Sequence, residues 1–382
     1  MADLKITMPE VFEMCNWDYK LLSASKHEYR TICPACNHKT LEVNDFVGQC
    51  WNCSEKFNAV SFIAKACGID NKAAYKKLIK EGKIDTSSNS ISSNYHGIEE
   101  NPMADIDKRH KANQIIIDNL FLSKNHKKEF SLKRGVPADL FYSMGYRSYP
   151  TDKQLRFKVA KAVKDNMGFI SGIPGLYTDK KTGMPTLCWR KRGILVPYRD
   201  IHYRIQGFQN RKDESVREKD KDGKLENKYD HVSSGGKKDG TSSSAFVHFA
   251  CDFYVEWKTK ERWPRINDSV FLTEGAMKAD IAHYYSGLPF LAIPGVNART
   301  QLEKVLIKLK ERGVTKLYDC FDMDYLTNES VQKARNSIKE MCEQHDISYE
   351  AILWDEKYKG IDDYLIYLSK IDKLDDFKIK YK

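Results

Sequence analysis

Two pairs of cysteines constrain the N-terminal part of this chain more than any other feature of its sequence. Cys33-Pro-Ala-Cys36 and Cys50-Trp-Asn-Cys53 are C-x-x-C pairs separated by thirteen residues. Each pair turns the backbone so that two thiolates face one ion, and the separation fits a short hairpin that brings the pairs together. The spacing therefore predicts a zinc ribbon that holds one structural Zn²⁺ through four thiolates. His38 could replace one cysteine, but we expect it in a solvent-facing loop.

The remaining cysteines carry no such pattern. The chain has 10 cysteines in 382 residues, and its N-terminus, MADLKITMPE, lacks an apolar signal segment. A disulfide framework is not expected in such a chain, so the isolated cysteines are interpreted as small apolar residues. No apolar run approaches 18 residues, and the mean hydropathy is −0.60. These features predict a cytoplasmic protein that does not enter a membrane.

Length and charge suggest several domains and a polyanionic partner. A chain of 382 residues predicts two or three domains, and 63 Lys and Arg against 53 Asp and Glu leave a net charge of +10. This excess favours nucleic acid, although a solvated lysine-rich surface explains it equally well. Residues 83–107 include the polar run DTSSNSISSNYHGIEENPMAD and are predicted to be a flexible linker. The charged run at 211–228 and the serine-rich run at 233–244 are predicted to be mobile surface loops.

The last third of the chain reads as an α/β unit. From residue 270 onward, β-type runs such as VFLTE, FLAIPG and KLYDCFDMD alternate with helical runs. This alternation is typical of a parallel sheet flanked by helices. There is no internal repeat and no G-x-x-x-x-G-K-[ST] phosphate loop, which excludes a P-loop motor.

Acidic residues follow two of these predicted strands. Glu274 comes directly after one strand, and Asp322 and Asp324 come directly after another. The carboxyl ends of parallel strands share one edge of the sheet, so these three side chains are expected to converge. Carboxylate oxygens suit Mg²⁺ or Mn²⁺, and the pattern therefore predicts a catalytic metal site. Helix capping explains one such residue easily, but explains two ordered motifs less well. Asp280 and Asp319 are expected at the surface or at helix caps.

The zinc module resembles the N-terminal zinc-binding domain of bacterial and phage DNA primases. In that family a hydrophobic helix follows the last cysteine, and Asn58 to Ile63, NAVSFI, occupies that place here. The commonest form of the domain uses three cysteines and a histidine, whereas this chain has a fourth cysteine.

The middle region resembles the segment that opens the polymerase core of those primases. The matching runs are LKRGV at 132–136, RKRGILVPYRD at 190–200, IQGFQNR at 205–211 and KY at 228–229. The resemblance implies that template phosphates and the nucleotide triphosphate are held by four basic residues, namely Arg134, Arg192, Arg211 and Lys228. Tyr198, Tyr203 and Phe208 either stack on bases or belong to the core.

The C-terminal unit resembles the Toprim domain shared by primases, topoisomerases and certain nucleases. Glu274 lies in its EG motif, and Asp322 and Asp324 form its DxD motif. The later run KGIDDYL at 359–365 is similar to the family ending "kDpDeyL", which implies that Asp362 completes the metal shell. Gly360, however, stands in place of the first aspartate of that ending.

A second departure concerns Lys278. It stands where many primases have an aspartate, and it is expected either to contact phosphate or to be solvated. As a whole, the resemblance implies a multidomain α/β protein with four segments. They are a zinc-binding domain at 1–82, the linker at 83–107, an α+β basic part of the primase core at 108–267 and a Toprim domain with a parallel sheet at 268–382.

This organisation implies a stand-alone DNA primase that makes RNA primers. The expected partners are a single-stranded DNA template, nucleoside triphosphates, the RNA primer product and a separately encoded replicative helicase. Two alternatives remain open, a Toprim nuclease that hydrolyses phosphodiesters and a non-catalytic DNA-binding accessory protein of a mobile element. A topoisomerase is disfavoured, because it needs a positioned tyrosine nucleophile and no sequence motif singles out any of the 21 tyrosines.

Overall fold

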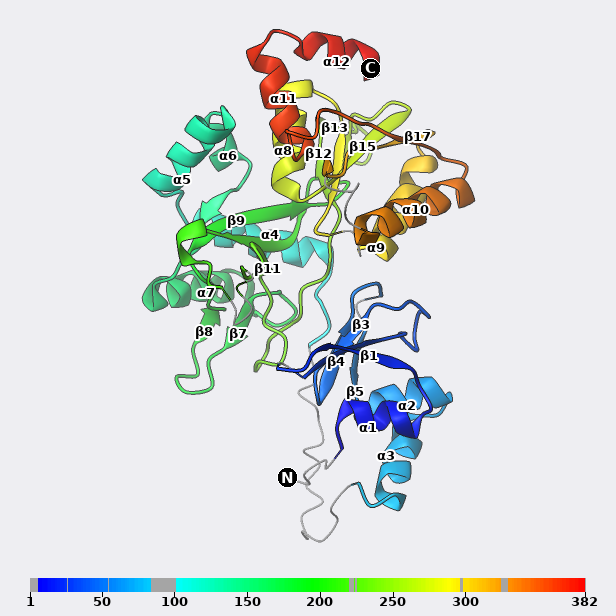
Figure 1. Cartoon of the computed structure of the whole chain (residues 1–382). Coiled ribbons are helices and arrows are strands. Elements are labelled where there is room, and N and C mark those ends of the chain that lie inside the picture. Colours follow the sequence, from blue (N-terminus) through cyan, green and yellow to red (C-terminus); the bar gives the residue numbers. More distant parts are fainter. Residues whose placement is uncertain are drawn as a thin grey trace. The chain divides into compact units, whose positions relative to one another are not determined.

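The chain forms two compact units in the computed structural model (Figure 1). The model describes residues 6–25, 27–53, 55–83, 101–219, 223, 225–295, 298–323 and 329–381. The N-terminal unit comprises Met1–Gly97 with Asn297–Thr300, and the larger unit comprises Ile98–Val296 with Gln301–Lys382. Most of the predicted linker, residues 84–100, lies outside the described residues.

The N-terminal unit is a five-stranded antiparallel sheet with three helices. The strands follow in chain order as β1 (Tyr19–Ser23), β2 (Glu28–Thr31), β3 (Leu41–Val43), β4 (Val47–Cys50) and β5 (Lys56–Asn58). The helices are α1 (Met8–Met14), α2 (Ala59–Cys67) and α3 (Asn71–Lys80). The Asn58 side chain caps α2 by accepting a hydrogen bond of 2.9 Å from the Ser61 amide, which explains why the helix starts directly after β5. Phe12, Leu41 and Phe62 are fully buried in the core of this unit.

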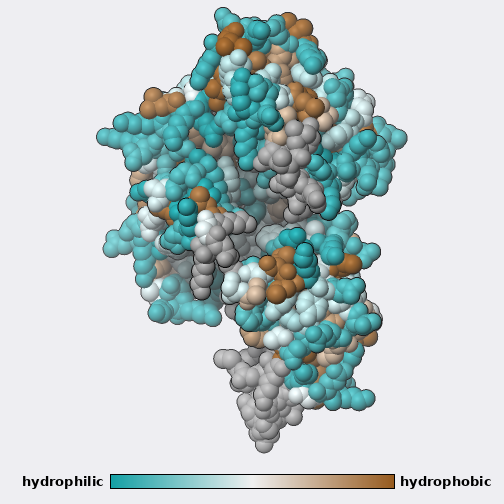
Figure 2. Space-filling model, viewed as in Figure 1, coloured by the Kyte–Doolittle hydropathy of each residue, from teal (hydrophilic) through white to brown (hydrophobic). Residues whose placement is uncertain are grey.

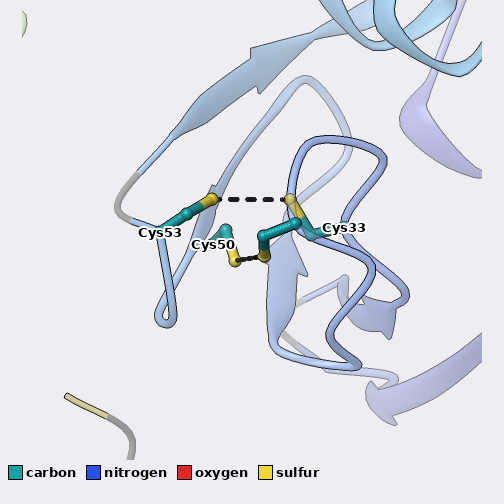
Figure 3. Close-up of side chains that lie close together, drawn as sticks. Cys33, Cys50 and Cys53 are labelled. Atoms are coloured by element: carbon teal, nitrogen blue, oxygen red, sulfur yellow. Dashed lines mark hydrogen bonds between the residues drawn. The ribbon is translucent and has the colours of Figure 1, made fainter. Parts of the chain in front are cut away.

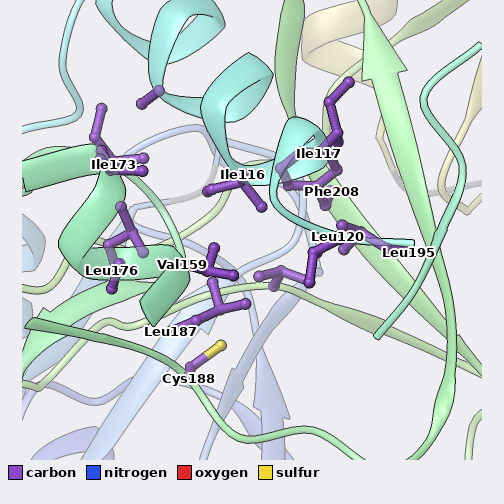
Figure 4. Close-up of a cluster of buried hydrophobic side chains, with 14 of the residues drawn as sticks. Ile116, Ile117, Leu120, Val159, Ile173, Leu176, Leu187, Cys188, Leu195 and Phe208 are labelled. Atoms are coloured by element: carbon purple, nitrogen blue, oxygen red, sulfur yellow. The ribbon is translucent and has the colours of Figure 1, made fainter. Parts of the chain in front are cut away.

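The first half of the larger unit is built on an antiparallel sheet. Its order is β11 (Tyr229–His231), β10 (Ile205–Lys212), β9 (Gly193–Arg199) and β6 (Arg147–Ser148). Around it lie α4 (Ile106–Asp118), α5 (Lys124–Lys128), the π-helix η1 (Glu129–Lys133), α6 (Ala138–Ser143), α7 (Lys153–Met167) and the 3₁₀-helix η2 (Glu214–Val216). Two short hairpins complete this half, formed by β7 (Leu176–Thr178) with β8 (Pro185–Leu187) and by β13 (Phe253–Val255) with β14 (Arg262–Pro264). Figure 4 shows the core that α4 and α7 form with this region, including Ile116, Val159 and Phe208.

Two residues of the serine-rich run at 233–244, Ser234 and Thr241, are buried. The prediction of a mobile surface loop is wrong for these two residues. Ser234 is 1% exposed and Thr241 is 3% exposed. The Ser234 hydroxyl donates to the Leu176 carbonyl at 2.7 Å and accepts from the Gly175 amide at 3.2 Å. A small hydroxyl side chain satisfies these buried backbone groups, and composition alone does not reveal such partners.

The second half of the larger unit contains the predicted parallel sheet flanked by helices. The sheet order is β12 (His248–Ala250), β16 (Phe290–Ile293), β15 (Ser269–Glu274), β17 (Lys316–Asp319) and β18 (Ser348–Ala351), and only β12 runs antiparallel. The connecting helices are α8 (Ala276–Ser286), α9 (Arg299–Lys310) and α10 (Glu329–Gln344), followed by α11 (Ile361–Lys370) and α12 (Leu374–Tyr381). In Figure 1, α8 and α11 lie on one side of this sheet, and α9 and α10 lie on the other. This is the arrangement that right-handed crossovers give, because β16 lies on one side of β15, whereas β17 and β18 lie on the other.

Two aspartates in the second half of the larger unit are buried and bind side chains from other elements. Asp280 on α8 accepts hydrogen bonds from the Tyr146 hydroxyl and from His248, the latter at 3.0 Å. Asp319, at the end of β17, is fully buried and accepts from Arg335 at 2.6 Å. Both aspartates were expected at the surface or at helix caps, and this expectation is wrong, because their partners come from distant parts of the chain.

No described helix is long and apolar enough to span a membrane. The face of the molecule in Figure 2 is mostly hydrophilic, with hydrophobic residues in small, separate groups.

Candidate functional site

The four cysteines of the two C-x-x-C pairs come together in the N-terminal unit (Figure 3). Cys33 Sγ lies 3.7 Å from Cys53 Sγ, and Cys36 Sγ lies 3.6 Å from Cys50 Sγ. All four sulfur atoms lie within 4.8 Å of one another. A tetrahedron with Zn–S bonds of about 2.3 Å places its sulfur atoms about 3.8 Å apart. The cluster therefore has the dimensions of a structural zinc site.

Hydrogen bonds favour the thiolate form at one position of the cluster, Cys50, whereas the hydrogen bond with Cys50, together with burial, raises the pKa of Cys33. The bond with Cys33, together with the one from the Thr40 hydroxyl at 3.3 Å, lowers the pKa of Cys50 to about 4. The Ala35 amide donates to Cys33 Sγ at 3.4 Å, as is typical of C-x-x-C turns. His38 is exposed and directs Nδ1 to the Cys36 carbonyl, so it lies outside the cluster, as expected.

The strand-end carboxylates lie at one edge of the parallel sheet. Register pairs Leu272 of β15 with Asp319 of β17, so Glu274 and Asp322 both lie just beyond this last pair. Gly275, with φ of 91°, makes the turn from β15 into α8. Asp324 lies outside the described residues. Glu274 and Asp322 therefore share the edge where ligands bind in α/β sheets.

Asp362, at the start of α11, joins this edge from a different part of the chain. It is 1% exposed, and its Oδ1 has no hydrogen-bond partner among the described residues. The neighbouring Gly360 leaves room at this point: a Cβ there would lie 2.5 Å from Asp362 Oδ1 and 3.4 Å from Asp322 Oδ1. A buried carboxylate oxygen without a donor, close to a second carboxylate, suits a hard divalent cation. The donor set therefore fits Mg²⁺ or Mn²⁺.

Glu274, Asp322 and Asp362 form a group that we call the acidic centre. Lys278 extends into this centre from α8. Its ammonium donates to Asp322 Oδ1, and its side chain is 26% exposed. Burial alone would lower the pKa of Lys278, but the negative charges of Asp322 and Asp362, with that of Glu274, outweigh burial and raise it. Lys278 is therefore held among carboxylates, and its expected contact with phosphate stays a prediction.

The four basic residues named from the sequence line one cavity of about 530 Å³ in the larger unit. Most of them are held by carboxylates on neighbouring elements. Arg211, which is 5% exposed, donates to Glu129 at 2.6 Å, and Lys228 pairs with Glu214 at 2.7 Å. The bond from Lys228 is the main cause that lowers the pKa of Glu214 to about 2. The other lining residues are Asn125, His126, Glu129, Lys133, Asp213, Glu214, Ser215 and Asp363.

Arg192 is held in a chain of side-chain contacts that sequence reasoning missed. Arg192 Nε donates to Asp213 at 2.7 Å, and the other oxygen of Asp213 lies 2.9 Å from Nε2 of the buried His126. Asp213 directly follows β10, so its place at a strand end was the available signal.

Arg134 connects the cavity with the acidic centre. It lines the cavity, and its Nη1 donates to Asp362 at 2.8 Å and to Asp363 at 3.1 Å. The Tyr285 hydroxyl donates to the Arg134 carbonyl at 2.8 Å and so holds the backbone of this segment. The Arg134 guanidinium therefore belongs both to the carboxylates that suit a metal and to the cations that suit phosphates.

The aromatic residues near the basic strands are largely structural. Tyr198 and Phe208 are 1% and 2% exposed, so they belong to the core. Tyr203 lies in the turn after β9, where the Arg199 guanidinium lies 4.0 Å from the ring centre. It lines a second cavity of about 530 Å³ together with Arg147, Arg199 and Arg262, which sequence reasoning did not identify.

Comparison with known proteins gives one family match in the C-terminal part of the chain. Residues 262–370 match a family described as a domain of unknown function (DUF3854). No curated protein matches the sequence.

The solved structures that are similar to this chain include several primases. The zinc-binding and RNA polymerase domains of the Aquifex aeolicus primase are 15% identical, with a TM-score of 0.46, over 98% of this chain and 82% of that one. A DNA primase domain from Pseudomonas aeruginosa is 17% identical, with a TM-score of 0.44, over 72% of this chain and 78% of that one. The RNA polymerase domain of the Mycobacterium tuberculosis primase, in complex with double-stranded DNA that has an overhang, is 14% identical, with a TM-score of 0.45. This match covers 72% of this chain and 84% of that one.

Proposed function

We propose that this chain is a DNA primase, a DNA-templated RNA polymerase that makes short RNA primers on single-stranded DNA. The observation that carries the proposal is the position of Arg134, which contacts Asp362 of the acidic centre and also lines the cavity described above. We call it the cationic cavity, because five of its lining residues are basic and four are acidic. The order of the primase-like motifs in the sequence supports the same reading. Polymerase chemistry needs a phosphate-binding cavity beside an acidic centre, because a nucleotide triphosphate must be held next to the reacting groups.

The cationic cavity is the proposed site for the triphosphate and the template phosphates. Guanidinium groups bind phosphate oxygens through paired hydrogen bonds, and Arg134 and Arg192 are the more accessible arginines there. Arg211 and Lys228 contribute positive charge while their carboxylate partners hold them in place. The acidic partners also prevent the cavity from becoming a purely cationic surface.

The acidic centre is the proposed place of nucleotidyl transfer. The 3′-oxygen of the primer would attack the α-phosphorus, the new P–O bond would form as the bond to pyrophosphate breaks, and the hydroxyl proton would pass to water. When bound, Mg²⁺ or Mn²⁺ would lower the pKa of this hydroxyl and neutralise charge on the leaving group. Glu274, Asp322 and Asp362 would hold the ion, together with Asp324.

The N-terminal unit would present the template or select the start site. We propose one structural Zn²⁺ on Cys33, Cys36, Cys50 and Cys53, with domain limits of 1–82, 83–107, 108–267 and 268–382. A polar linker allows the zinc module to reach the core while remaining tethered. Single-stranded DNA, nucleoside triphosphates and a separately encoded helicase are the proposed partners.

A primer-synthesis assay tests the proposal. Full-length protein is incubated with single-stranded DNA of mixed sequence, Mg²⁺ or Mn²⁺ and labelled ribonucleotides, and compared with Asp322→Asn. The exposed Asp355→Asn in the same unit is the matched control. Short labelled RNA that is made by the parent and by Asp355→Asn but not by Asp322→Asn is expected. Cleaved DNA without RNA would replace the proposal with a nuclease, and intact bound DNA without RNA would indicate an accessory protein.

A further inference from the structure

The acidic centre contains a cation of its own. The ammonium of Lys278 donates to Asp322 Oδ1, and the Lys278 side chain approaches Gly360, where Cε would lie 3.4 Å from an added Cβ. These are the two positions at which the sequence departs from the primase pattern by losing an aspartate. The structure places them face to face, so the two departures belong to one local rearrangement.

Gly360 leaves the space that this arrangement uses. A Cβ at this position would lie 2.5 Å from Asp362 Oδ1, which is closer than real Cβ contacts come. A side chain there would therefore shift the Asp362 carboxylate. With glycine at this position, the Asp362 carboxylate keeps a buried oxygen without a hydrogen-bond partner beside Asp322. The Lys278 side chain also has room to reach Asp322.

Charge balance indicates how many metal ions such a centre takes. Four described carboxylates lie in or next to this centre, on Glu274, Asp322, Asp362 and Asp363. They are opposed by three cations, namely the Lys278 and Lys359 ammoniums near Asp322 and the Arg134 guanidinium that contacts Asp362 and Asp363. One net negative charge remains among the described residues. One divalent cation more than offsets this charge, and a second would add two further positive charges to a partly buried site, which is costly.

We propose that Lys278 takes the place of one cation in this centre, so that the chain binds a single Mg²⁺ or Mn²⁺ where a two-metal polymerase binds a pair. Two-metal sites place a cation on both sides of the reacting phosphate. Here the ammonium supplies one of these charges without depending on the metal concentration. The catalytic role of Lys278 rests on the proposed function, but the number of metal ions does not.

The test is to count Mn²⁺ ions in full-length protein that is already loaded with zinc. Free Mn²⁺ is measured by electron paramagnetic resonance during a titration, with and without a nucleoside triphosphate, after the nucleotide's own Mn²⁺ binding is subtracted. We expect one Mn²⁺ per chain for the parent. Restoring both acids in Lys278→Asp/Gly360→Asp is expected to add a second Mn²⁺.

A milder variant covers the case in which the double variant does not fold. Lys278→Met removes the ammonium with little change of volume and is expected to tighten Mn²⁺ binding by at least about tenfold, because a like charge beside the ion is lost. Lys359→Ala is the matched control, since Lys359 Nζ lies 3.8 Å from Asp322 on an exposed side chain. It is expected to change Mn²⁺ affinity less than Lys278→Met does.

The outcomes separate this inference from the proposed function. Zero or two Mn²⁺ ions in the parent, or unchanged or weaker Mn²⁺ binding in Lys278→Met, would overturn the inference. Absence of primer synthesis together with one Mn²⁺ per chain would overturn the primase proposal and leave the single-ion centre standing. If both hold, Lys278→Met is expected to lose primer synthesis while it binds Mn²⁺ more tightly, and Lys278→Arg is expected to recover part of the activity.

Discussion

Arg134 Nη1 lies 2.8 Å from Asp362 Oδ2, although the two residues are 228 positions apart in the sequence. Arg134 follows the π-helix η1 in the basic half of the larger unit, and Asp362 begins α11 in the α/β half. Their contact makes the wall of the cationic cavity continuous with the acidic centre.

Arg134→Gln is expected to reduce primer synthesis by about 10²-fold, because one preorganised cation next to the reacting phosphate is lost. It is also expected to lower the free energy of unfolding by about 3 kcal/mol, since Asp362 then remains buried without this partner. Activity assays and urea denaturation measure the two effects. Arg265→Gln, at an exposed arginine of the same unit, is the control. Parent-like activity in Arg134→Gln would show that the contact has no catalytic role.

Tyr146→Phe is expected to destabilise the larger unit without changing its chemistry. The Tyr146 hydroxyl donates to Asp280, and both residues are buried, so its removal leaves a buried acceptor with one partner fewer. The expected loss is about 1–3 kcal/mol in the free energy of unfolding. Urea denaturation measures it, with the exposed Tyr284→Phe as a control that should differ little from the parent. An unchanged midpoint in Tyr146→Phe would contradict this assignment.

Cys50→Ser is expected to abolish zinc binding and to unfold the N-terminal unit alone. Three thiolates leave a structural tetrahedral site incomplete, and the short strands of this unit depend on the ion for much of their stability. Metal analysis should give one zinc per chain for the parent and none for the variant. Hydrogen exchange should show lost protection at residues 28–58 and retained protection in the larger unit. Cys67→Ser, at an exposed cysteine outside the cluster, should retain zinc.

His110 is expected to make the protein less stable as the pH falls below about 6.5. Burial, and then the positive charge of Arg199, lower the pKa of His110 in the folded state. The unfolded chain therefore binds a proton at a pH where the folded chain does not, and protonation favours unfolding. His110 Nδ1 accepts from the Ile205 amide at 3.2 Å, and Asn can accept this bond without titrating. In urea denaturation at pH 7.5 and 5.5, His110→Asn should lose less stability than the parent.

Features that depend on residues close in sequence were predictable. Within each C-x-x-C pair a tight turn directs the two thiols toward one ion, so the spacing of Cys33, Cys36, Cys50 and Cys53 was sufficient to predict the cluster. The alternation of strands and helices after residue 270 predicted the parallel sheet, because that pattern has few stable packings.

Features that depend on long-range packing were predicted poorly. Asp280 and Asp319 are buried because Tyr146, His248 and Arg335 reach them from other elements, and no local pattern encodes these contacts. The packed serine run anchored by Ser234 is a similar case. Composition reports the polarity of a segment but not whether buried partners are available to it.

In the candidate site, too, local sequence determined some features and long-range packing determined others. The sequence by itself determined the candidate groups: four thiols with zinc spacing, Glu274 and Asp322 at strand ends, and a basic middle region. Only the tertiary structure decided that Lys278 and Gly360 face each other among the carboxylates and that Arg134 connects the acidic centre to the cavity. The physical reason is that side-chain type and local spacing are properties of the chain, whereas the distance between two charges depends on how separate elements pack.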